Sequence, residues 1–450
     1  MATREDIVRE LKEFISFPSI SADSRRQQSM FDCASWLAGH LYETGMQNVH
    51  VLPTSAHPVV YGEYTSDAAL PTILFYGHYD VTPVDPLNKW DTPPFRPAIK
   101  GDYIVGRGAS DDKGQLFTHI KAVAAQLRQK GQLPVNVKFL VEGAEEIGSL
   151  GLEDFISRHK ELLRCDAVVV SDTKMAGPGM PAITYSLRGS IKVEVEIRTM
   201  TKDLHSGTFG GYVPNAAIKM AEFIAGLHNK DNSIAIPGFY EDVRNPSPAE
   251  RAFRALNGIS DKELMQESGA FAPWGESRYT IYERITSRPS LTVTGITTGY
   301  QGMGFKEVIP AIASVKLNFR LVPDQDPQTI AGLLERHIRN NIRDAEVRIT
   351  YGAFGYPVTI PRDNFYIRAA VQACEKAFGR KPRFLQNGGT IGAVDHLHTI
   401  LGVPVVLLGF AQADDNMHAP NEKFYLPDFF KGIDTIRHFL ILAAAGKLKV

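Results

Sequence analysis

The sequence has little cysteine and no excess of charge of either sign. Its 450 residues include only three cysteines, Cys33, Cys165 and Cys374, which are scattered along the chain. This usage argues against a disulfide framework and favours a reducing compartment, which we expect to be the cytoplasm. Lys plus Arg total 49 and Asp plus Glu total 50, so the basic excess of a typical nucleic-acid-binding protein is missing. We therefore expect no nucleic-acid partner.

Long apolar runs and phosphate-binding loops are also missing from the sequence. The longest apolar run, 403–410, includes Pro404 and is far shorter than the roughly 18 residues that a membrane span needs. The first residues, MATREDIVRELKEF, are charged and amphipathic, unlike the apolar core of a signal peptide. Neither a Walker pattern nor G-x-G-x-x-G after a strand occurs. These observations predict a protein without a membrane partner.

The composition that remains is that of an ordinary globular protein, with 44% hydrophobic and 22% charged residues. At roughly 100–200 residues per domain, the length fits two domains. Helical patterns alternate with short buried strands such as 72–81, 135–141 and 167–172 in residues 1–186, and the pattern returns over 358–450. This alternation predicts an α/β catalytic domain with a central, mostly parallel sheet.

Residues 187–357 have a different pattern. IKVEVEIRTM (191–200) and SVKLNFRLV (314–322) alternate apolar and polar residues, as strands with one solvated face do. Helical patterns at 214–228 and 327–340 accompany them. We expect an inserted α+β domain that divides the first domain into two parts.

Helices elsewhere are expected at 5–17, 28–44, 113–129, 152–163, 364–378 and near 427–446, and an irregular stretch is expected at 83–108. No internal repeat or low-complexity segment is visible.

Polar residues with possible chemical roles follow the predicted strands. They are His78 and Asp80, Asp111, the pair Glu145 and Glu146, Asp172, and His418. Open α/β sheets bind ligands at the carboxyl ends of their strands, so these side chains are expected near one another. The period of two in a strand also places His78 and Asp80 on one face.

Each of these residues alone also has an ordinary structural explanation. His78 could bond to a neighbouring carboxylate, Asp111 or Asp112 could cap a helix, and Asp172 could form a turn. The glutamates could form an exposed acidic loop, and a single histidine in a loop is usually structural. Together, however, five imidazole and carboxylate ligands and a spare glutamate fit two metal ions better than one. Such ligands favour Zn²⁺, Mn²⁺ or Co²⁺ over a thiolate-bound metal.

These motifs resemble those of the M20 family of dinuclear metallopeptidases. The resemblance is carried along the chain by HYD (78–80), GRGASDDKG (106–114), EGAEEIGS (142–149), SDT (171–173), HSG (205–207) and MHAPNE (417–422). It implies a zinc-exopeptidase-like catalytic domain interrupted by a lid and dimerisation domain. It also implies two divalent metal ions per subunit, with Zn²⁺ expected ahead of Mn²⁺ or Co²⁺.

The resemblance also implies a role for each catalytic residue. His78, Asp111 and Asp172 would hold one metal, and Asp111, Glu146 and His418 would hold the other. Glu145 would be the general base for a water that bridges the metals, and Asp80 would orient His78. A cis peptide bond is expected between Asp111 and Asp112.

In the inserted domain, the resemblance implies substrate-binding residues and a homodimer. His205 would reach the active site of a partner subunit and stabilise the oxyanion. Arg320, Gly389 and Thr390 would bind the substrate carboxylate, since the guanidinium group suits a carboxylate. Ordinary alternatives are a structural loop histidine for His205 and a surface ion pair for Arg320.

Three features resemble the dipeptidase branch, which contains carnosinase-like and cytosolic nonspecific dipeptidases. They are the segment HYDVTPVDPLNKWDTPPFRP, the DDKG motif and HSGTFGG. The resemblance implies hydrolysis of dipeptides with a free C-terminal carboxylate. The alternative is an N-acyl amino acid deacylase, of the acetylornithine deacetylase or succinyl-diaminopimelate desuccinylase type, that uses the same metal site. Glu307 stands where these dipeptidases often have threonine, which leaves the side-chain preference open.

Overall fold

The computed structural model describes residues 3–449, and these divide into two compact units. Unit 1 comprises residues up to Tyr185 together with Ile360–Leu385 and the chain from Ile391 onward. Unit 2 comprises Ser186–Thr359 and the short segment Gln386–Thr390. The expected insertion at 187–357 lies inside unit 2, which also takes in a segment from much later in the chain.

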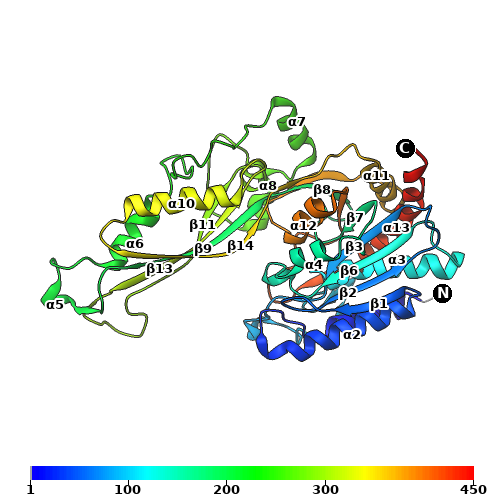
Figure 1. Cartoon of the computed structure of the whole chain (residues 1–450), viewed down its shortest axis with the longest axis horizontal. Coiled ribbons are helices and arrows are strands. Elements are labelled where there is room, and N and C mark those ends of the chain that lie inside the picture. The colour runs from blue at the N-terminus through cyan, green and yellow to red at the C-terminus, as the bar shows by residue number, and fades with distance from the viewer. Residues whose placement is uncertain (1–2, 450) are drawn as a thin grey trace. The chain divides into compact units, whose positions relative to one another are not determined.

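The main sheet of nine strands has the order β1-β2-β6-β3-β7-β17-β8-β15, with β16 paired to β8. Figure 1 labels β1, β2, β6, β3, β7 and β8 of this sheet. Its strands are β1 (Gln47–Leu52), β2 (Val59–Tyr64), β3 (Thr72–His78), β6 (Asn136–Glu142), β7 (Ala167–Val170), β8 (Ala182–Leu187), β15 (Val358–Thr359), β16 (Arg383–Asn387) and β17 (Val405–Gly409). The strands β6, β3, β7 and β17 pair in parallel, while β1, β2, β8 and β15 pair antiparallel. The sheet is therefore mixed and not mostly parallel as expected, because parallel pairing is confined to its middle.

The helices of unit 1 are α1 (Arg4–Ser16), α2 (Gln27–Glu43), α3 (Lys113–Lys130), α4 (Leu152–Arg158), α11 (Phe365–Phe378), α12 (Gly392–Leu401) and α13 (Leu426–Ala443). The packed group α3, α11 and α13 contacts β3 and β17, and α2 contacts β1 and β2. The middle strands are buried on both faces, as in an α/β core. No helix among residues 3–449 is both long and apolar enough to cross a membrane.

Two expectations for unit 1 were wrong. The helix expected at 152–163 ends at Arg158, because the polar residues 159–161 offer no apolar side chain to the core. The stretch 83–108 is not wholly irregular. It contains β4 (Ala98–Lys100) and β5 (Tyr103–Val105), which form a small sheet with β18 (Lys423–Tyr425).

Unit 2 is built on an antiparallel sheet of four strands in the order β11-β13-β9-β14. The strands are β9 (Gly189–Arg198), β11 (Ser290–Thr298), β13 (Ile312–Leu321) and β14 (Glu346–Gly355), and a separate pair is β10 (Leu204–His205) with β12 (Val308–Ile309). The helices are α5 (Ser206–Phe209), α6 (Ala216–Ala225), α7 (Pro248–Asn257), α8 (Asp261–Ser268), α9 (Ile281–Thr286) and α10 (Pro327–Asn341).

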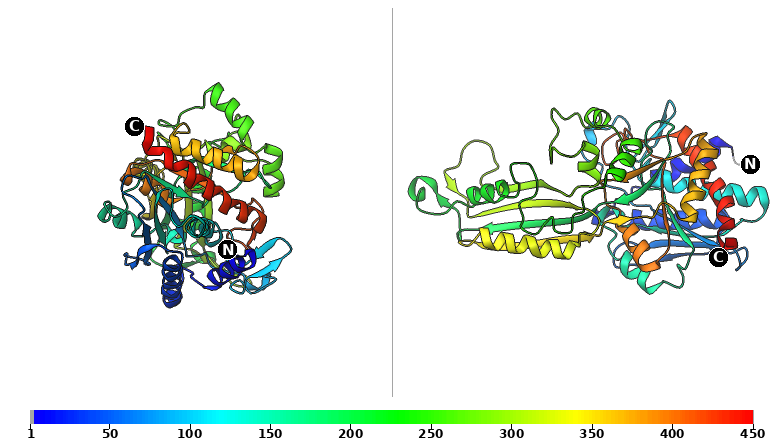
Figure 2. Two further views of the ribbon diagram at one scale, coloured as in Figure 1. Left: turned by 90° about the vertical axis from the view of Figure 1, so that its right-hand side faces the viewer. Right: turned by 90° about the horizontal axis from the view of Figure 1, so that it is seen from above.

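The alternation of apolar and polar residues explains how this sheet packs. Ile191, Val193, Val195 and Ile197 of β9 join one core cluster with residues from α6 and α10. The charged residues between them, such as Glu194, lie on the other face. Helix α10 runs along the strands of this sheet in the right-hand view of Figure 2.

Candidate active site

The parallel strands of unit 1 place most of the predicted site residues at one edge of the sheet. His78 is the last residue of β3 and stands in register with Glu142, the last residue of β6. Glu145 and Glu146 follow in a short 3₁₀ turn, and Asp172 follows β7. Because parallel strands end at the same edge, residues separated by many positions in the sequence meet there.

His78 lies fully buried between two carboxylates. Its Nδ1 is 3.3 Å from Asp80 Oδ1, and its Nε2 is 3.1 Å from Asp111 Oδ1. The Asp80 carboxylate also accepts hydrogen bonds from the backbone N–H groups of Glu145 (3.2 Å) and Glu146 (3.1 Å). Asp80 therefore fixes both an imidazole ring and the turn that carries the two glutamates.

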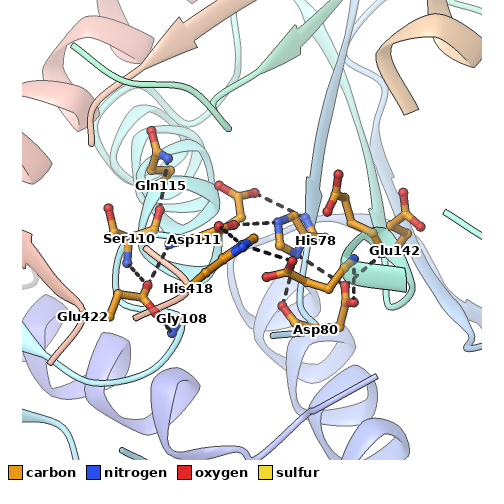
Figure 3. A network of polar contacts seen from close by, with 12 residues as sticks. His78, Asp80, Gly108, Ser110, Asp111, Gln115, Glu142, His418 and Glu422 are labelled. Carbon is orange, nitrogen blue, oxygen red and sulfur yellow. Dashed lines mark hydrogen bonds and ion pairs between the residues drawn. The ribbon is translucent and has the colours of Figure 1, made fainter. Parts of the chain in front are cut away.

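Asp111 lies at the centre of the cluster, with both histidines directed at it (Figure 3). His418 Nε2 is 2.9 Å from Asp111 Oδ2 and 3.1 Å from Glu146 Oε2. Two overlapping sets of possible metal ligands result, one of His78, Asp111 and Asp172 and one of Asp111, Glu146 and His418, each with its ligand atoms within 4.8 Å of one another. Asp111 belongs to both sets.

The helix-cap explanation for Asp111 and Asp112 does not hold. Asp112 is the N-cap residue of α3, but its side chain makes no capping hydrogen bond. Its Oδ2 instead accepts a hydrogen bond of 3.3 Å from the His78 backbone N–H. The peptide bond between Asp111 and Asp112 is cis, as the resemblance implied.

The donor set of this cluster fits divalent metal ions. Five carboxylates, those of Asp80, Asp111, Glu145, Glu146 and Asp172, face only two imidazoles. Among residues 3–449, no Lys or Arg lies within ion-pair distance of these five. Burial raises the pKa values of Glu145 and Asp172 well above the usual range, and nearby carboxylates add to the effect at both. Divalent cations would supply the missing positive charge, and imidazole and carboxylate are ligands that Zn²⁺, Mn²⁺ and Co²⁺ accept.

The electrostatics of Asp111 and His418 fit the same interpretation. Burial alone would raise the pKa of Asp111, but hydrogen bonds from His418 and His78 hold it below its ordinary value. The hydrogen bonds to Asp111 and then to Glu146 raise the pKa of His418 to about 10. The site thus stabilises positive charge at the atoms that would bind a metal.

A second group of predicted residues meets in unit 2. Arg320 on β13 stands in register between Ser290 on β11 and Ser190 on β9. Its Nη1 donates a hydrogen bond of 2.8 Å to Thr390 Oγ1, and no carboxylate among residues 3–449 pairs with it. The surface ion pair considered for Arg320 is therefore absent from the described chain. A partly buried guanidinium without an anionic partner in the described chain suits the carboxylate of a substrate.

His205 lies on β10 of unit 2, whereas Arg320 lies on β13. Its Nδ1 accepts a hydrogen bond of 3.0 Å from the Gly207 backbone N–H. Its Nε2 is 3.2 Å from Glu307 Oε2, and both side chains are largely exposed. With Nδ1 acting as acceptor, the proton of the neutral ring lies on Nε2, which is the donor that an oxyanion would need.

Several residues that shape these sites were not predicted. Arg188 donates hydrogen bonds to the carbonyl oxygens of Gly388 (2.9 Å) and Arg288 (3.1 Å), and its own carbonyl accepts one from Thr390. Glu142, at the end of β6, accepts hydrogen bonds from Tyr76 and Ser149. Glu422 binds the loop that carries Asp111. Glu142 and Glu422 lie in the quoted motifs, so their position was visible although their contacts were not.

The comparisons with known proteins agree with the fold. The model of peptidase family M20/M25/M40 matches residues 74–441. The Cys-Gly metallodipeptidase of Schizosaccharomyces pombe is 30% identical over 449 residues, which cover 96% of this chain and 94% of the relative. The Beta-Ala-His dipeptidase of Homo sapiens is 29% identical over 459 residues, with 97% and 90% covered.

Among solved structures, an M20 family metallo-carboxypeptidase from Sulfolobus solfataricus superposes with a TM-score of 0.90 at 34% identity, covering 98% of this chain and 99% of that one. These findings define a hydrolase of the metallopeptidase class. The chain belongs to peptidase family M20/M25/M40, and the predicted resemblance to its dipeptidase branch is confirmed.

Proposed function

We propose that this protein is a metal-dependent dipeptidase that hydrolyses the peptide bond of dipeptides with a free C-terminal carboxylate. The observation that carries the proposal is the pair of overlapping ligand sets that share Asp111. The similarity to dipeptidases over almost the whole chain supports the substrate class. We further propose two divalent ions per subunit, with Zn²⁺ as the first choice and Mn²⁺ or Co²⁺ as substitutes.

In this proposal, His78, Asp111 and Asp172 hold one ion, and Asp111, Glu146 and His418 hold the other. Bound there, the ions would supply Lewis-acid polarisation of the scissile carbonyl and lower the pKa of water. Asp80 keeps His78 oriented through Nδ1.

Glu145 is the general base in this proposal. It belongs to neither ligand set, yet the Asp80 carboxylate fixes its backbone beside that of Glu146. Glu145 would accept a proton from the attacking water and return it to the amine of the leaving amino acid.

The residues of unit 2 would bind the remainder of the substrate. Arg320, held by Thr390, would pair with the C-terminal carboxylate, and Gly389 lies in the same segment. His205 would donate from Nε2 to the developing oxyanion of a partner subunit's site, which makes unit 2 the lid and dimerisation domain of a homodimer. The low cysteine content supports a cytoplasmic location.

A carboxypeptidase is a second candidate, because the similar protein from Sulfolobus solfataricus is a metallo-carboxypeptidase. Both activities need a free C-terminal carboxylate, so Arg320 serves either. They differ in whether the amino-terminal side of the substrate must be a free amine. Hydrolysis of Ala-Ala but not of N-blocked Ala-Ala supports the dipeptidase, and hydrolysis of N-blocked or longer peptides supports the carboxypeptidase.

A further inference from the structure

One buried carboxylate outside the proposed ligand sets holds the loop that carries Asp111. Glu422 is fully buried, and its side chain lies against the loop segment that carries Gly108, Ser110 and Asp111 (Figure 3). Its Oε2 accepts hydrogen bonds from Arg107 Nη1 (2.8 Å) and the Gly108 N–H (2.9 Å). Its Oε1 accepts hydrogen bonds from the N–H groups of Ser110 (2.9 Å) and Asp111 (3.0 Å). Each oxygen thus receives two donors.

The loop depends on Glu422 for most of its backbone hydrogen bonds. The Gly106 N–H also donates to the Glu422 backbone carbonyl at 2.9 Å. Four of the six backbone N–H groups at 106–111 therefore donate hydrogen bonds to Glu422. The other two donate to the carbonyls of Pro94 and Gly106. The Glu422 carboxylate accepts three of the four bonds to Glu422. Because buried N–H groups need partners, loss of the carboxylate would leave the Asp111 N–H without its acceptor.

Two further side chains, those of Asp415 and Gln115, also hold this loop. Ser110 Oγ donates to Asp415 Oδ2 at 2.9 Å, and Gln115 donates to the Ser110 carbonyl at 3.0 Å. These contacts do not use the Asp111 N–H as a donor. A change confined to Glu422 should therefore displace Asp111 without releasing the whole loop.

We propose that Glu422 is a positioning residue for the metal site, which sets the place of Asp111 by accepting its backbone N–H and that of Ser110. The inference rests on the proposed function, since it gives Asp111 the role of shared ligand. The four donors require a group that only accepts hydrogen bonds, which an ionised carboxylate is and an amide is not. In either orientation, the amide of a Glu422→Gln variant would direct its NH₂ group at one of the two donor pairs.

The test is the affinity of chelator-stripped protein for Mn²⁺ and Zn²⁺, measured by titration calorimetry or competition with a chromophoric chelator. For Glu422→Gln we expect the affinity for at least one ion to fall about 10–100-fold, as is usual when a group that orients a metal ligand is changed. Loss of hydrolysis should be reversed by excess metal.

Asp428→Asn is the matched control. Asp428 is equally buried and accepts a hydrogen bond from Gln412, and no hydrogen bond or ion pair joins its side chain to residues 106–111.

Thermal unfolding of the metal-stripped proteins separates positioning from folding. If Glu422→Gln and Asp428→Asn both lower the melting temperature but only the former weakens metal binding, the inference is supported. Metal affinity equal to that of wild type in folded Glu422→Gln would overturn it. If that variant does not fold, metal titration of the Glu422→Asp variant tests the inference instead. It keeps every acceptor on a shorter side chain, and unchanged metal affinity in it would also overturn the inference.

A failure of the proposed function would give a different pattern of metal binding. In that case, wild-type protein would bind no divalent ion, or Asp111→Asn would bind as tightly as wild type. If Asp111→Asn loses binding and Glu422→Gln does not, only the role of Glu422 is wrong.

Discussion

At the scale of single residues, neighbouring carboxylates have different surroundings and therefore different expected roles. Glu146 Oε2 is 3.1 Å from His418 Nε2, whereas no Lys, Arg or His among residues 3–449 forms an ion pair with Glu145. Glu145 and Glu146 are adjacent on a turn that the Asp80 carboxylate fixes, so their side chains can serve separate purposes. The chemistry thus depends on backbone placement as much as on residue type.

Replacing Glu145 by glutamine should separate catalysis from metal binding. We expect kcat to fall about 10²–10⁴-fold, since general-base catalysis contributes on this scale. Metal content should remain that of wild type, because Glu145 lies outside both ligand sets. Metal analysis and steady-state kinetics of the same preparation check this. Asp172→Asn is the contrasting variant and should lose metal, whereas near-normal turnover in Glu145→Gln would contradict the assigned role.

His40, on helix α2, should make the stability of the protein depend on pH. Burial, and then the neighbouring Lys121, lowers the pKa of His40 to about 4. An unfolded histidine titrates near 6.5, so between these values the unfolded chain binds more protons and stability falls as pH falls. Relative to His40→Gln, wild type should lose on the order of 1–2 kcal/mol between pH 7 and pH 5. Urea unfolding at both pH values measures this, and parallel pH profiles would contradict it.

At the scale of elements, local periodicity predicted the long helices and strands but not the short ones. Helices α7, α8 and α9 were not expected, although each begins with a capping box at Ser247, Ser260 or Thr280. The pairing of β5 with β18 joins Val105 to Lys423 and leaves no local signal. Short elements of this kind are stabilised by caps or by distant partners, which hydrophobic periodicity does not report.

The same limit applies to the candidate site. The motifs contained all five proposed ligand residues. Of these, His78 ends β3, and Asp111 and Asp172 lie within two residues of a helix start or a strand end. The contacts of Arg188 with Gly388 and of Glu422 with Ser110 join segments 200 and 312 positions apart. Such contacts follow only from the tertiary fold.

Position 114, in the first turn of α3, should tolerate only glycine. A Cβ there would lie 1.9 Å from the Ala109 carbonyl oxygen, within the loop that carries Asp111. Gly114→Ala should lower the free energy of unfolding by about 1–3 kcal/mol or more and weaken metal binding.

Gly39 in α2 provides the matched control, because an added Cβ would meet nothing within 4 Å. Gly39→Ala should stabilise the protein by about 0.5–1 kcal/mol, since alanine favours helix interiors. Chemical denaturation and metal titration of both variants check the contrast. Equal effects of the two substitutions would show that the loop does not constrain α3.

At the scale of the whole molecule, the proposed homodimer predicts complementation between two inactive variants. A Glu145→Ala subunit has an intact His205, and a His205→Ala subunit has an intact Glu145. If His205 acts across subunits, a mixed dimer has one complete site. Random equal mixing makes half of the dimers mixed, which restores about a quarter of the sites. Activity after co-refolding or subunit exchange measures this, and no gain over the separate variants would contradict the action of His205 across subunits.

The central claim is metal-dependent hydrolysis of dipeptides, and a substrate panel on chelator-stripped protein tests it most directly. The panel contains Ala-Ala, Leu-Gly, carnosine, N-blocked Ala-Ala, N-acetylornithine and N-succinyl-diaminopimelate, each assayed with and without added Zn²⁺ or Mn²⁺. We predict hydrolysis of unblocked dipeptides only when metal is restored, with no activity in Asp111→Asn. Hydrolysis that needs no metal, or metal-dependent hydrolysis of the acylated substrates alone, would contradict the proposed function.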